Sequence, residues 1–273
     1  MVYRPRVLGP MTSLLRPRTV LLALLFLLLS ACSSDGATTA AEEVVSAEPA
    51  SDVPDTAPAI DTGGVATGSV EIDGTTIDYV TSVPDGFEPG DEAPLLLAFG
   101  GGSQTIGIAS ASVEGTYGPE ARRLGWVVVS PAAPDGVRYF DGSESLVPGF
   151  LDWVETWVTP EGGAPHVAGI SNGGISSFRY AVQNPDRVQS VISFPGFPRG
   201  DADRAALRDL TAIPIRMYVG ETDTNWIPPA EQAVEIFTEA GGNIELTIFA
   251  GEGHIMDSTR DGTVIFEQLE SFR

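Results

Sequence analysis

The sequence predicts an α/β fold, in which a mostly parallel central β-sheet is covered by helices on both faces. From residue 94 onward, short apolar runs alternate with segments of helical periodicity, and repeated strand–helix units build parallel sheets. The runs Pro94–Phe99 and Trp126–Ser130 are apolar almost throughout, which is typical of strands buried on both faces. Before them, Ser69–Asp73 and Thr75–Ser82 are joined at Asp73-Gly74, a favoured two-residue turn, and predict an antiparallel N-terminal hairpin.

The later elements alternate in chain order. Helices are expected where apolar residues recur on one face, as Leu151, Val154 and Val158 do. The strands and helices expected after the first buried strand are helix Gly115–Leu124, strand Trp126–Ser130, helix Phe150–Val158, strand His166–Ile170, helix Gly173–Gln183, strand Val188–Phe194, helix Asp201–Leu210, strand Ile213–Gly220, helix Pro228–Ala240, strand Ile244–Ala250 and helix Asp261–Phe272. Long insertions between them are absent, so we expect no large lid.

Residues 1–32 are predicted to be an export signal. Four arginines precede the ten apolar residues Val20–Leu29, and small residues follow, which is the pattern of a secretory signal peptide. A transmembrane helix would need about 20 apolar residues. The segment Leu29–Cys32 also resembles the bacterial lipobox, and Cys32 is the only cysteine. We therefore expect an exported protein, held on the extracytoplasmic side of the cell membrane by a lipidated Cys32; an ordinary signal peptide is the alternative.

The next segment, residues 33–68, is predicted to be a disordered acidic linker. It consists largely of Ala, Ser, Thr, Pro and acidic residues and contains no aromatic residue. Such a composition buries too little apolar surface to offset the entropy lost on ordering. The linker would hold a catalytic domain of residues 69–273 away from the membrane. A short acidic recognition segment is the alternative reading.

The composition excludes several functions. The chain has 15 arginines, no lysine and 37 acidic residues, for a net charge of -22, and so acidic a surface repels nucleic acid. A single cysteine excludes an internal disulfide and a thiolate zinc site. Two histidines leave little material for a histidine-rich metal centre. The composition leaves the oligomeric state open.

A candidate nucleophile lies in the segment Gly169–Gly173, which fits the pattern G-x-S-x-G. An apolar strand is expected before it and a helix after it, which is the context of a nucleophile elbow. The glycines allow a sharp turn, and the serine hydroxyl then stands above the sheet near the positive end of the helix. Ser171 is therefore the candidate nucleophile. An idle serine in a glycine-rich turn is the alternative.

The base and its acid follow from the positions of the remaining strands. Serine needs a base to take its proton. His166 is expected at the wrong end of its strand and is interpreted as a strand-terminal or surface residue. His254 follows the strand Ile244–Ala250, at the carboxyl edge where α/β sheets place their sites. Asp223 follows the strand before it and is the candidate acid that orients His254, with Glu221 as its rival.

The candidate oxyanion hole consists of backbone N–H groups. One belongs to Asn172, the residue after the nucleophile, and the other to Gly101 or Gly102, in the loop after the first buried strand. A phosphate-binding loop is the alternative, but the sequence has no G-K-[ST] motif. Apolar residues expected at this edge suggest a small, open acyl pocket. They are Phe99, Phe194, Phe197, Trp226, Ile255 and Met256.

These motifs resemble those of the α/β-hydrolase superfamily, in the order Ser, Asp, His, over residues 69–273. The segments GISNGG, LLLAFGGG, VGETD and GEGH are similar to those of secreted esterases grouped with polyhydroxybutyrate depolymerases and feruloyl or acetylxylan esterases. The resemblance implies an ester substrate and an acyl-serine intermediate hydrolysed by water, with no metal or organic cofactor. It departs at Phe99, where the family usually has a histidine before the oxyanion glycines.

Two other functions stay open at this point. A non-catalytic surface protein could keep the fold as a binding module, although the complete set of Ser, Asp and His argues against it. A serine peptidase of the same superfamily is the second alternative, and the lack of a propeller or a large cap argues against that one. Carboxylic-ester hydrolysis is the function that the sequence favours.

Overall fold

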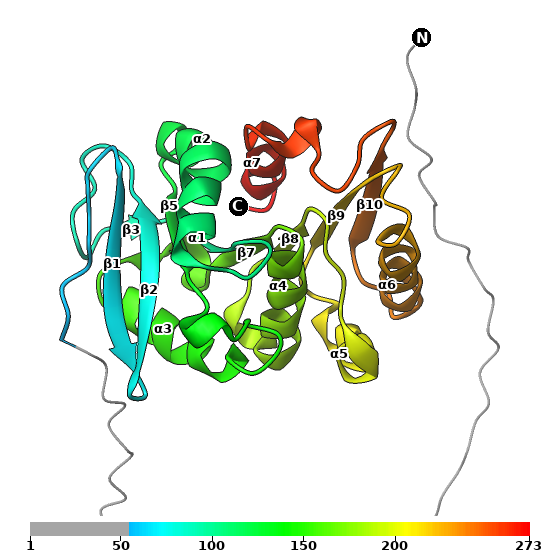
Figure 1. Cartoon of the computed structure of the whole chain (residues 1–273), viewed down its shortest axis with the longest axis horizontal. Coiled ribbons are helices and arrows are strands. Elements are labelled where there is room, and N and C mark those ends of the chain that lie inside the picture. Colours follow the sequence, from blue (N-terminus) through cyan, green and yellow to red (C-terminus); the bar gives the residue numbers. More distant parts are fainter. Residues whose placement is uncertain (1–54) are drawn as a thin grey trace, which may run out of the picture. The chain divides into compact units, whose positions relative to one another are not determined.

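The computed structural model describes residues 55–273, and its core is an eight-stranded mixed sheet. The strands are β1 Val65–Ile72, β2 Thr75–Ser82, β4 Leu95–Phe99, β5 Val127–Pro131, β7 His166–Gly169, β8 Val191–Ser193, β9 Ile215–Gly220 and β10 Ile244–Phe249. Their order across the sheet is β1-β2-β5-β4-β7-β8-β9-β10 (Figure 1). The pairs β1–β2 and β2–β5 are antiparallel, and all the others are parallel. The predicted α/β fold with an antiparallel N-terminal hairpin is confirmed.

Helices cover both faces of this sheet, as Figure 1 shows. The helices are α1 Ile106–Ser112, α2 Gly118–Leu124, α3 Val147–Val154, α4 Asn172–Gln183, α5 Gly200–Ala206, α6 Ile227–Glu239 and α7 Thr263–Glu270. Helices α1, α2 and α7 pack on one face, and α3, α4 and α6 pack on the other. A separate pair of short parallel strands, β3 Glu92–Ala93 and β6 Thr159–Pro160, was not predicted.

The two faces explain why the central strands are apolar without alternation. In β4, Leu95, Leu97 and Phe99 join the apolar cluster under α3, α4 and α6, whereas Leu96 and Ala98 join the cluster under α1, α2 and α7. Successive side chains of a strand point to opposite faces, so a strand covered on both faces has no solvent-facing position. All five residues are fully buried. Because both faces are covered, a site at the centre of this sheet has to lie at the ends of its strands, and open α/β sheets place their sites at the carboxyl ends.

The folded region begins earlier than predicted. Val65 to Gly68 belong to β1 and pair with β2. The Ala59 N–H donates to the Tyr79 hydroxyl at 2.9 Å, and the Trp153 Nε1–H donates to the Thr56 carbonyl at 2.9 Å. The predicted linker boundary at residue 68 is thus wrong, because composition alone did not reveal these pairings. The signal peptide, Cys32 and residues 33–54 of the linker lie outside the described residues. No helix within residues 55–273 has the length and hydropathy to cross a membrane.

The first helical segment also begins earlier than predicted, at Ile106 instead of Gly115. It runs through α1, a π-helical turn at Val113–Tyr117, and α2. Glycine and serine are frequent in it and are poor helix formers, so the local sequence does not predict it. Packing decides the conformation instead, because Ala109 and Tyr117 are fully buried against the sheet. The remaining helices end within a few residues of their predicted limits.

His166 lies at the start of β7, at the edge opposite to the candidate site. It is strand-terminal, as one reading of the sequence had it, but it is not a surface residue, since it is only 1% exposed. Its Nδ1 lies 2.7 Å from the Ser190 hydroxyl, and its ring packs on Trp126 at 5.1 Å. Burial, followed by the nearby positive charge of Arg273, lowers the pKa of His166 to about 4. His166 is therefore a neutral core residue.

This burial makes the fold sensitive to mild acid. Between about pH 6.5 and pH 4, the unfolded chain binds a proton at His166 that the folded chain does not bind, so the free energy of unfolding falls as the pH falls. At about 1.4 kcal/mol per pKa unit, the loss amounts to as much as about 3 kcal/mol. Urea denaturation at pH 7 and pH 4 should show a smaller acid-induced loss for His166→Gln than for the wild type. Equal losses in the two proteins would contradict this explanation.

Candidate active site

The three residues proposed as nucleophile, base and acid come together at one edge of the sheet. Ser171 follows β7, Asp223 follows β9 and His254 follows β10. These strands are parallel, so their carboxyl ends share one edge, which is where open α/β sheets place their sites. Segments up to 83 residues apart in the sequence thus contact one another directly.

The turn at Ser171 is the most constrained backbone of the site. Ser171 has φ 57° and ψ −118°, a conformation that non-glycine residues rarely adopt and that costs on the order of 1–3 kcal/mol. A side chain at Gly169 would overlap the backbone of Gly173, and one at Gly173 would overlap the carbonyl of Phe99. The Ser171 N–H donates to the Pro195 carbonyl at 2.8 Å. The G-x-S-x-G pattern is thus required by close backbone contact as well as by the turn.

Ser171, His254 and Asp223 form a continuous chain of hydrogen bonds. The Ser171 hydroxyl oxygen lies 2.8 Å from His254 Nε2, and His254 Nδ1 lies 2.7 Å from Asp223 Oδ2. A carboxylate can only accept, so Nδ1 carries the ring proton and Nε2 is left to accept from the hydroxyl. The Asp223 side chain is 11% exposed and that of His254 is 36% exposed. The acid is thus shielded from water while the imidazole still reaches solvent.

The rival acid, Glu221, has a different contact. Its Oε2 accepts from the Gly251 N–H at 2.8 Å, in the loop that leads to His254. Next to it, the Thr222 N–H and hydroxyl both donate to the Glu252 carbonyl at 2.9 Å. The segment after β9 therefore does two things. Glu221 and Thr222 hold the histidine loop, and Asp223 is the one of the two acids that contacts the imidazole.

The predicted pocket residues divide into three groups. Phe194, Ile255 and Met256 line a cavity of about 90 Å³ beside His254. Trp226 is not in this lining; its ring packs on the imidazole at 4.9 Å, with Phe197 behind it at 5.0 Å. Phe99 does not reach the site, because its side chain is fully buried in the core against Tyr139. The expectation that all six residues form one pocket is therefore wrong.

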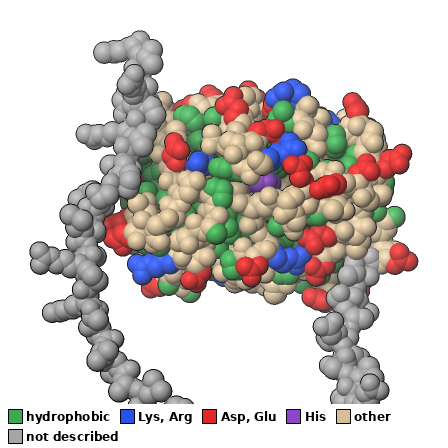
Figure 2. Space-filling model, turned by 180° about the vertical axis from the view of Figure 1, so that it is seen from behind, with side chains coloured by type: hydrophobic (Ala, Val, Ile, Leu, Met, Phe, Trp, Pro, Cys, Tyr) green, Lys and Arg blue, Asp and Glu red, His purple; other side chains and the backbone are tan. Residues whose placement is uncertain are grey.

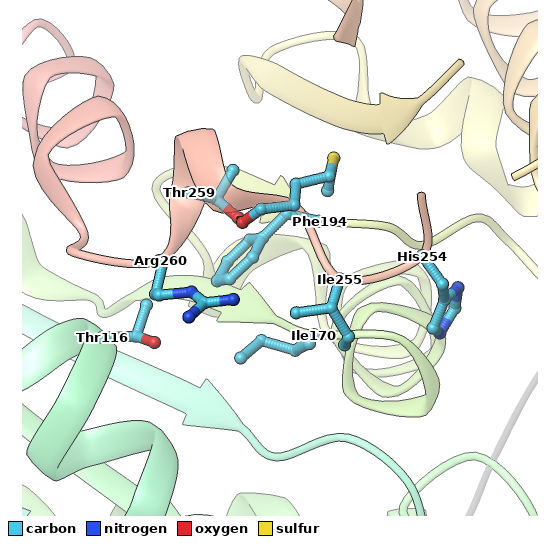
Figure 3. Close-up of a pocket in the computed structure, with 8 residues that line it drawn as sticks. Thr116, Ile170, Phe194, His254, Ile255, Thr259 and Arg260 are labelled. Atoms are coloured by element: carbon cyan, nitrogen blue, oxygen red, sulfur yellow. The ribbon is translucent and has the colours of Figure 1, made fainter. Parts of the chain in front are cut away.

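The cavity has an apolar middle and a polar far end, as Figure 3 shows. Ile170, Ile255 and Phe194 lie between His254 on one side and Arg260 on the other. Thr116, from the π-helical turn, and Thr259 complete the lining. The Arg260 guanidinium is also paired with Asp257 at 2.7 Å, on the solvent-exposed side. Sequence reasoning missed Ile170, Thr116, Thr259 and Arg260, since nothing local marks them as neighbours of the histidine.

The expected oxyanion donors lie next to the nucleophile. Asn172 begins α4, directly after Ser171. A Cβ placed on Gly101 would lie 3.6 Å from the Ser171 Cβ, which puts the glycine loop beside the nucleophile. The Asn172 side chain donates from Nδ2 to the Gly102 carbonyl at 2.8 Å and so links the two segments. Gln104 follows the glycines; it is buried, and sequence reasoning missed it.

The wider surface is acidic and offers no cluster suited to a metal. Figure 2 shows Asp and Glu side chains scattered over the visible face instead of gathered in one patch. Within the part of the chain that the structure describes, no group of three or more His, Cys, Asp or Glu side chains is arranged to hold a metal ion. The chemistry that these residues support is nucleophilic attack by serine with histidine as the base.

Several hydrolases are among the solved structures that superpose on this chain. A thermostable esterase superposes with a TM-score of 0.59 at 16% identity, over 76% of this chain and 62% of that one. A ferulic acid esterase superposes with a TM-score of 0.56 at 15% identity, over 77% of this chain and 97% of that one. A putative dipeptidyl aminopeptidase IV from Bacteroides ovatus ATCC 8483 gives 0.59 at 14% identity, over 77% and 35%.

These superpositions show that the chain has the α/β-hydrolase fold, as its motifs predicted. The chain spans less than two thirds of the length of that thermostable esterase and about a third of the peptidase. No protein-family model matches the sequence. No curated protein matches it either. Hydrolases with different activities share this fold, so the activity of this protein has to be inferred from the residues of the site.

The two acids after β9 can be separated by substitution. Asp223→Asn should lower kcat by up to about 10⁴, because an amide donating to Nδ1 selects the wrong imidazole tautomer. Glu221→Gln should change kcat little, since the amide oxygen can still accept from the Gly251 N–H. Steady-state kinetics of both variants on one aryl ester give the comparison, with circular dichroism as the control for folding. A larger loss of kcat for Glu221→Gln than for Asp223→Asn would mean that Glu221, not Asp223, orients the imidazole.

Proposed function

On the α/β-hydrolase fold, we propose that this protein is a serine hydrolase that cleaves carboxylic esters. The observation that carries the proposal is the unbroken chain of hydrogen bonds from the Ser171 hydroxyl through His254 to Asp223. Nucleophile, base and orienting acid are in reach of one another without rearrangement, which is the geometry that nucleophilic catalysis requires. A binding module would have no use for that arrangement at a strained turn.

The geometry gives the following mechanism. His254 Nε2 takes the proton of the Ser171 hydroxyl while the oxygen attacks the ester carbonyl carbon. The resulting oxyanion accepts hydrogen bonds from the backbone N–H of Asn172 and that of Gly101 or Gly102. His254 then gives its proton to the leaving alcohol, and an acyl-Ser171 remains. Water repeats the sequence with His254 as base, releases the carboxylic acid and restores the hydroxyl.

Two features favour an ester over a peptide substrate. The cavity of about 90 Å³ beside His254 is far smaller than the roughly 300–1,000 Å³ of pockets for larger ligands, and it suits a short acyl group. An enzyme that acts on esters, the ferulic acid esterase, superposes on this chain over 97% of its own length. Peptide hydrolysis is the second candidate, and a panel of matched ester and peptide substrates separates the two.

The nucleophile is tested by Ser171→Ala. Loss of the nucleophile from a working triad costs on the order of 10⁶ in kcat, so esterase activity should vanish while the melting temperature stays near that of the wild type. A fluorophosphonate probe should label the wild-type protein and not the variant. A variant that keeps more than about a hundredth of the activity would remove Ser171 from the mechanism.

The cavity predicts a preference for short acyl chains. Each methylene adds about 0.8 kcal/mol of binding only where it is buried, and a cavity this small leaves a long chain in water. Across p-nitrophenyl esters, kcat/KM should be highest from acetate to butyrate. Phe194→Leu, which enlarges the cavity, should move the optimum to longer chains, whereas the same change at the fully buried Phe178 should not. A wild-type maximum at twelve or more carbons would refute the proposed pocket.

The proposal includes export and a lipid anchor, on the basis of the sequence before residue 33. The apolar run Val20–Leu29 and the lone cysteine at the end of Leu29–Cys32 support it. The anchored protein would act on esters outside the cytoplasm. Cys32→Ala should abolish metabolic labelling with a fatty acid and shift the protein to the soluble fraction or block its processing. Equal labelling of the wild type and the variant would end this part of the proposal.

A further inference from the structure

The oxyanion hole of the proposed esterase is assembled from two separate segments. One donor belongs to the glycine loop after β4, and the other is the Asn172 N–H at the start of α4. About 70 residues separate the two segments in the sequence, and the pairing of β4 with β7, with the Ile170 N–H donating to the Phe99 carbonyl at 3.2 Å, brings only their starting points together. Something must therefore hold the two N–H groups at the spacing that one oxyanion requires. The Asn172–Gly102 hydrogen bond does so on the exposed side of the site.

Gln104 holds the same two segments together on the buried side. Its side chain is 1% exposed, and its backbone has a φ of 56°. The Gln104 N–H donates to the Gly101 carbonyl at 2.9 Å and closes the glycine loop into a tight turn. Its own carbonyl accepts from the Ala133 N–H at 2.7 Å, which fixes the loop to the segment after β5. Both backbone groups of Gln104 therefore shape the loop that carries Gly101 and Gly102.

The side-chain amide of Gln104 continues the connection to α4. Its Nε2 donates to the Ser176 hydroxyl at 2.9 Å, and that hydroxyl donates to the Asn172 carbonyl at 3.2 Å. Its Oε1 accepts from the Tyr139 N–H at 3.0 Å. One amide thus joins three segments that the sequence separates, and a path of two hydrogen bonds runs from the glycine loop to the residue that supplies the second donor.

We propose that Gln104 is a positioning residue for the oxyanion hole: it sets the spacing between the N–H of Asn172 and that of Gly101 or Gly102. The proposal rests on the ester hydrolysis proposed above. Gln104 does not touch the substrate. Its effect is exerted through Ser176 on one donor and through the Gly101 turn on the other. Losing an oxyanion donor costs about 10²–10³ in kcat, and a misplacement of about 1 Å can cost about 10².

The test is Gln104→Met, which keeps the volume of the side chain and removes both of its hydrogen bonds. We expect kcat to fall by roughly 10- to 100-fold and KM to change by less than about threefold, because the hole acts on the transition state. Binding of an aryl boronate, which forms a tetrahedral adduct on Ser171, should weaken in parallel with kcat/KM. Active-site titration with a fluorophosphonate corrects each rate for the amount of folded enzyme.

A matched control is Gln189→Met. Gln189 is another glutamine whose side-chain amide is hydrogen-bonded within the fold: it is half-buried, and its Nε2 donates to the carbonyls of Glu161 and Ala164. It lies near the start of the strands, away from the site. The Gln189→Met variant should have a lower melting temperature than the wild type, with unchanged kcat and boronate affinity.

If Gln104→Met does not fold, Ser176→Ala tests the proposal instead, since it removes only the hydroxyl between Gln104 and Asn172. We expect it to lower kcat and boronate affinity together by about three- to tenfold.

Three results would overturn the inference. One is a Gln104→Met enzyme with kcat within twofold of the wild type. The second is that Gln104→Met and Gln189→Met lower kcat and boronate affinity equally, which would mean that Gln104 only stabilises the fold. The third is a fall in kcat without weaker boronate binding. A wild-type protein that hydrolyses no ester in the panel would overturn the proposed function and this inference together, whereas an active wild type with an equally active Gln104→Met overturns the inference alone.

Discussion

The close passage of backbone at the turn from β7 to α4 is the constraint on which the site depends. Ser171 is held at a positive φ, and a side chain at Gly169 or Gly173 would overlap neighbouring backbone. The Phe99 carbonyl, at the end of β4, is the group that Gly173 approaches. The same contact that forces the turn therefore also brings the glycine loop after β4 beside Ser171, the proposed nucleophile. The same two glycines, Gly169 and Gly173, therefore permit both the turn that presents Ser171 and the close packing of β7 and α4 against the end of β4.

Hydrogen bonds from neighbouring loops then fix the other two members of the site. Glu221 and Thr222 hold the loop that ends at His254, and Trp226 covers one side of the imidazole. These groups do no chemistry in the proposed mechanism, but they limit the positions that the imidazole can take. Reactive groups placed on loops need such support, because a loop is otherwise the most mobile part of a fold. Here the support comes from the residues next to Asp223 in the chain, so acid and base are positioned together.

The surroundings of the imidazole differ on its two sides. The rings of Trp226 and Phe197 pack against the apolar cluster under α3, α4 and α6, whereas Phe194 and Met256 belong to the cluster under α1, α2 and α7. The small cavity lies only on the second side. His254 lies between the two clusters. In the proposed reaction, the acyl part of the ester would occupy the cavity on one side of the imidazole, and the alcohol part would point toward solvent in another direction. The 66% exposure of Ile255 leaves the mouth of the cavity partly open.

The sequence by itself determined the order of the main-sheet strands from Leu95 onward, the helices from α2 onward, and the edge at which Ser171, Asp223 and His254 meet. Both follow from local patterns: unbroken apolar runs, a glycine-framed serine, and loops placed directly after parallel strands. Tertiary structure alone decided the early start of α1, the pairing of residues 65–68 with β2, the core position of Phe99 and the burial of Gln104. Each of these depends on contacts between segments far apart in the chain. Glycine-rich or polar segments become ordered only when another segment of the chain, distant in the sequence, packs against them. The local composition does not identify that other segment.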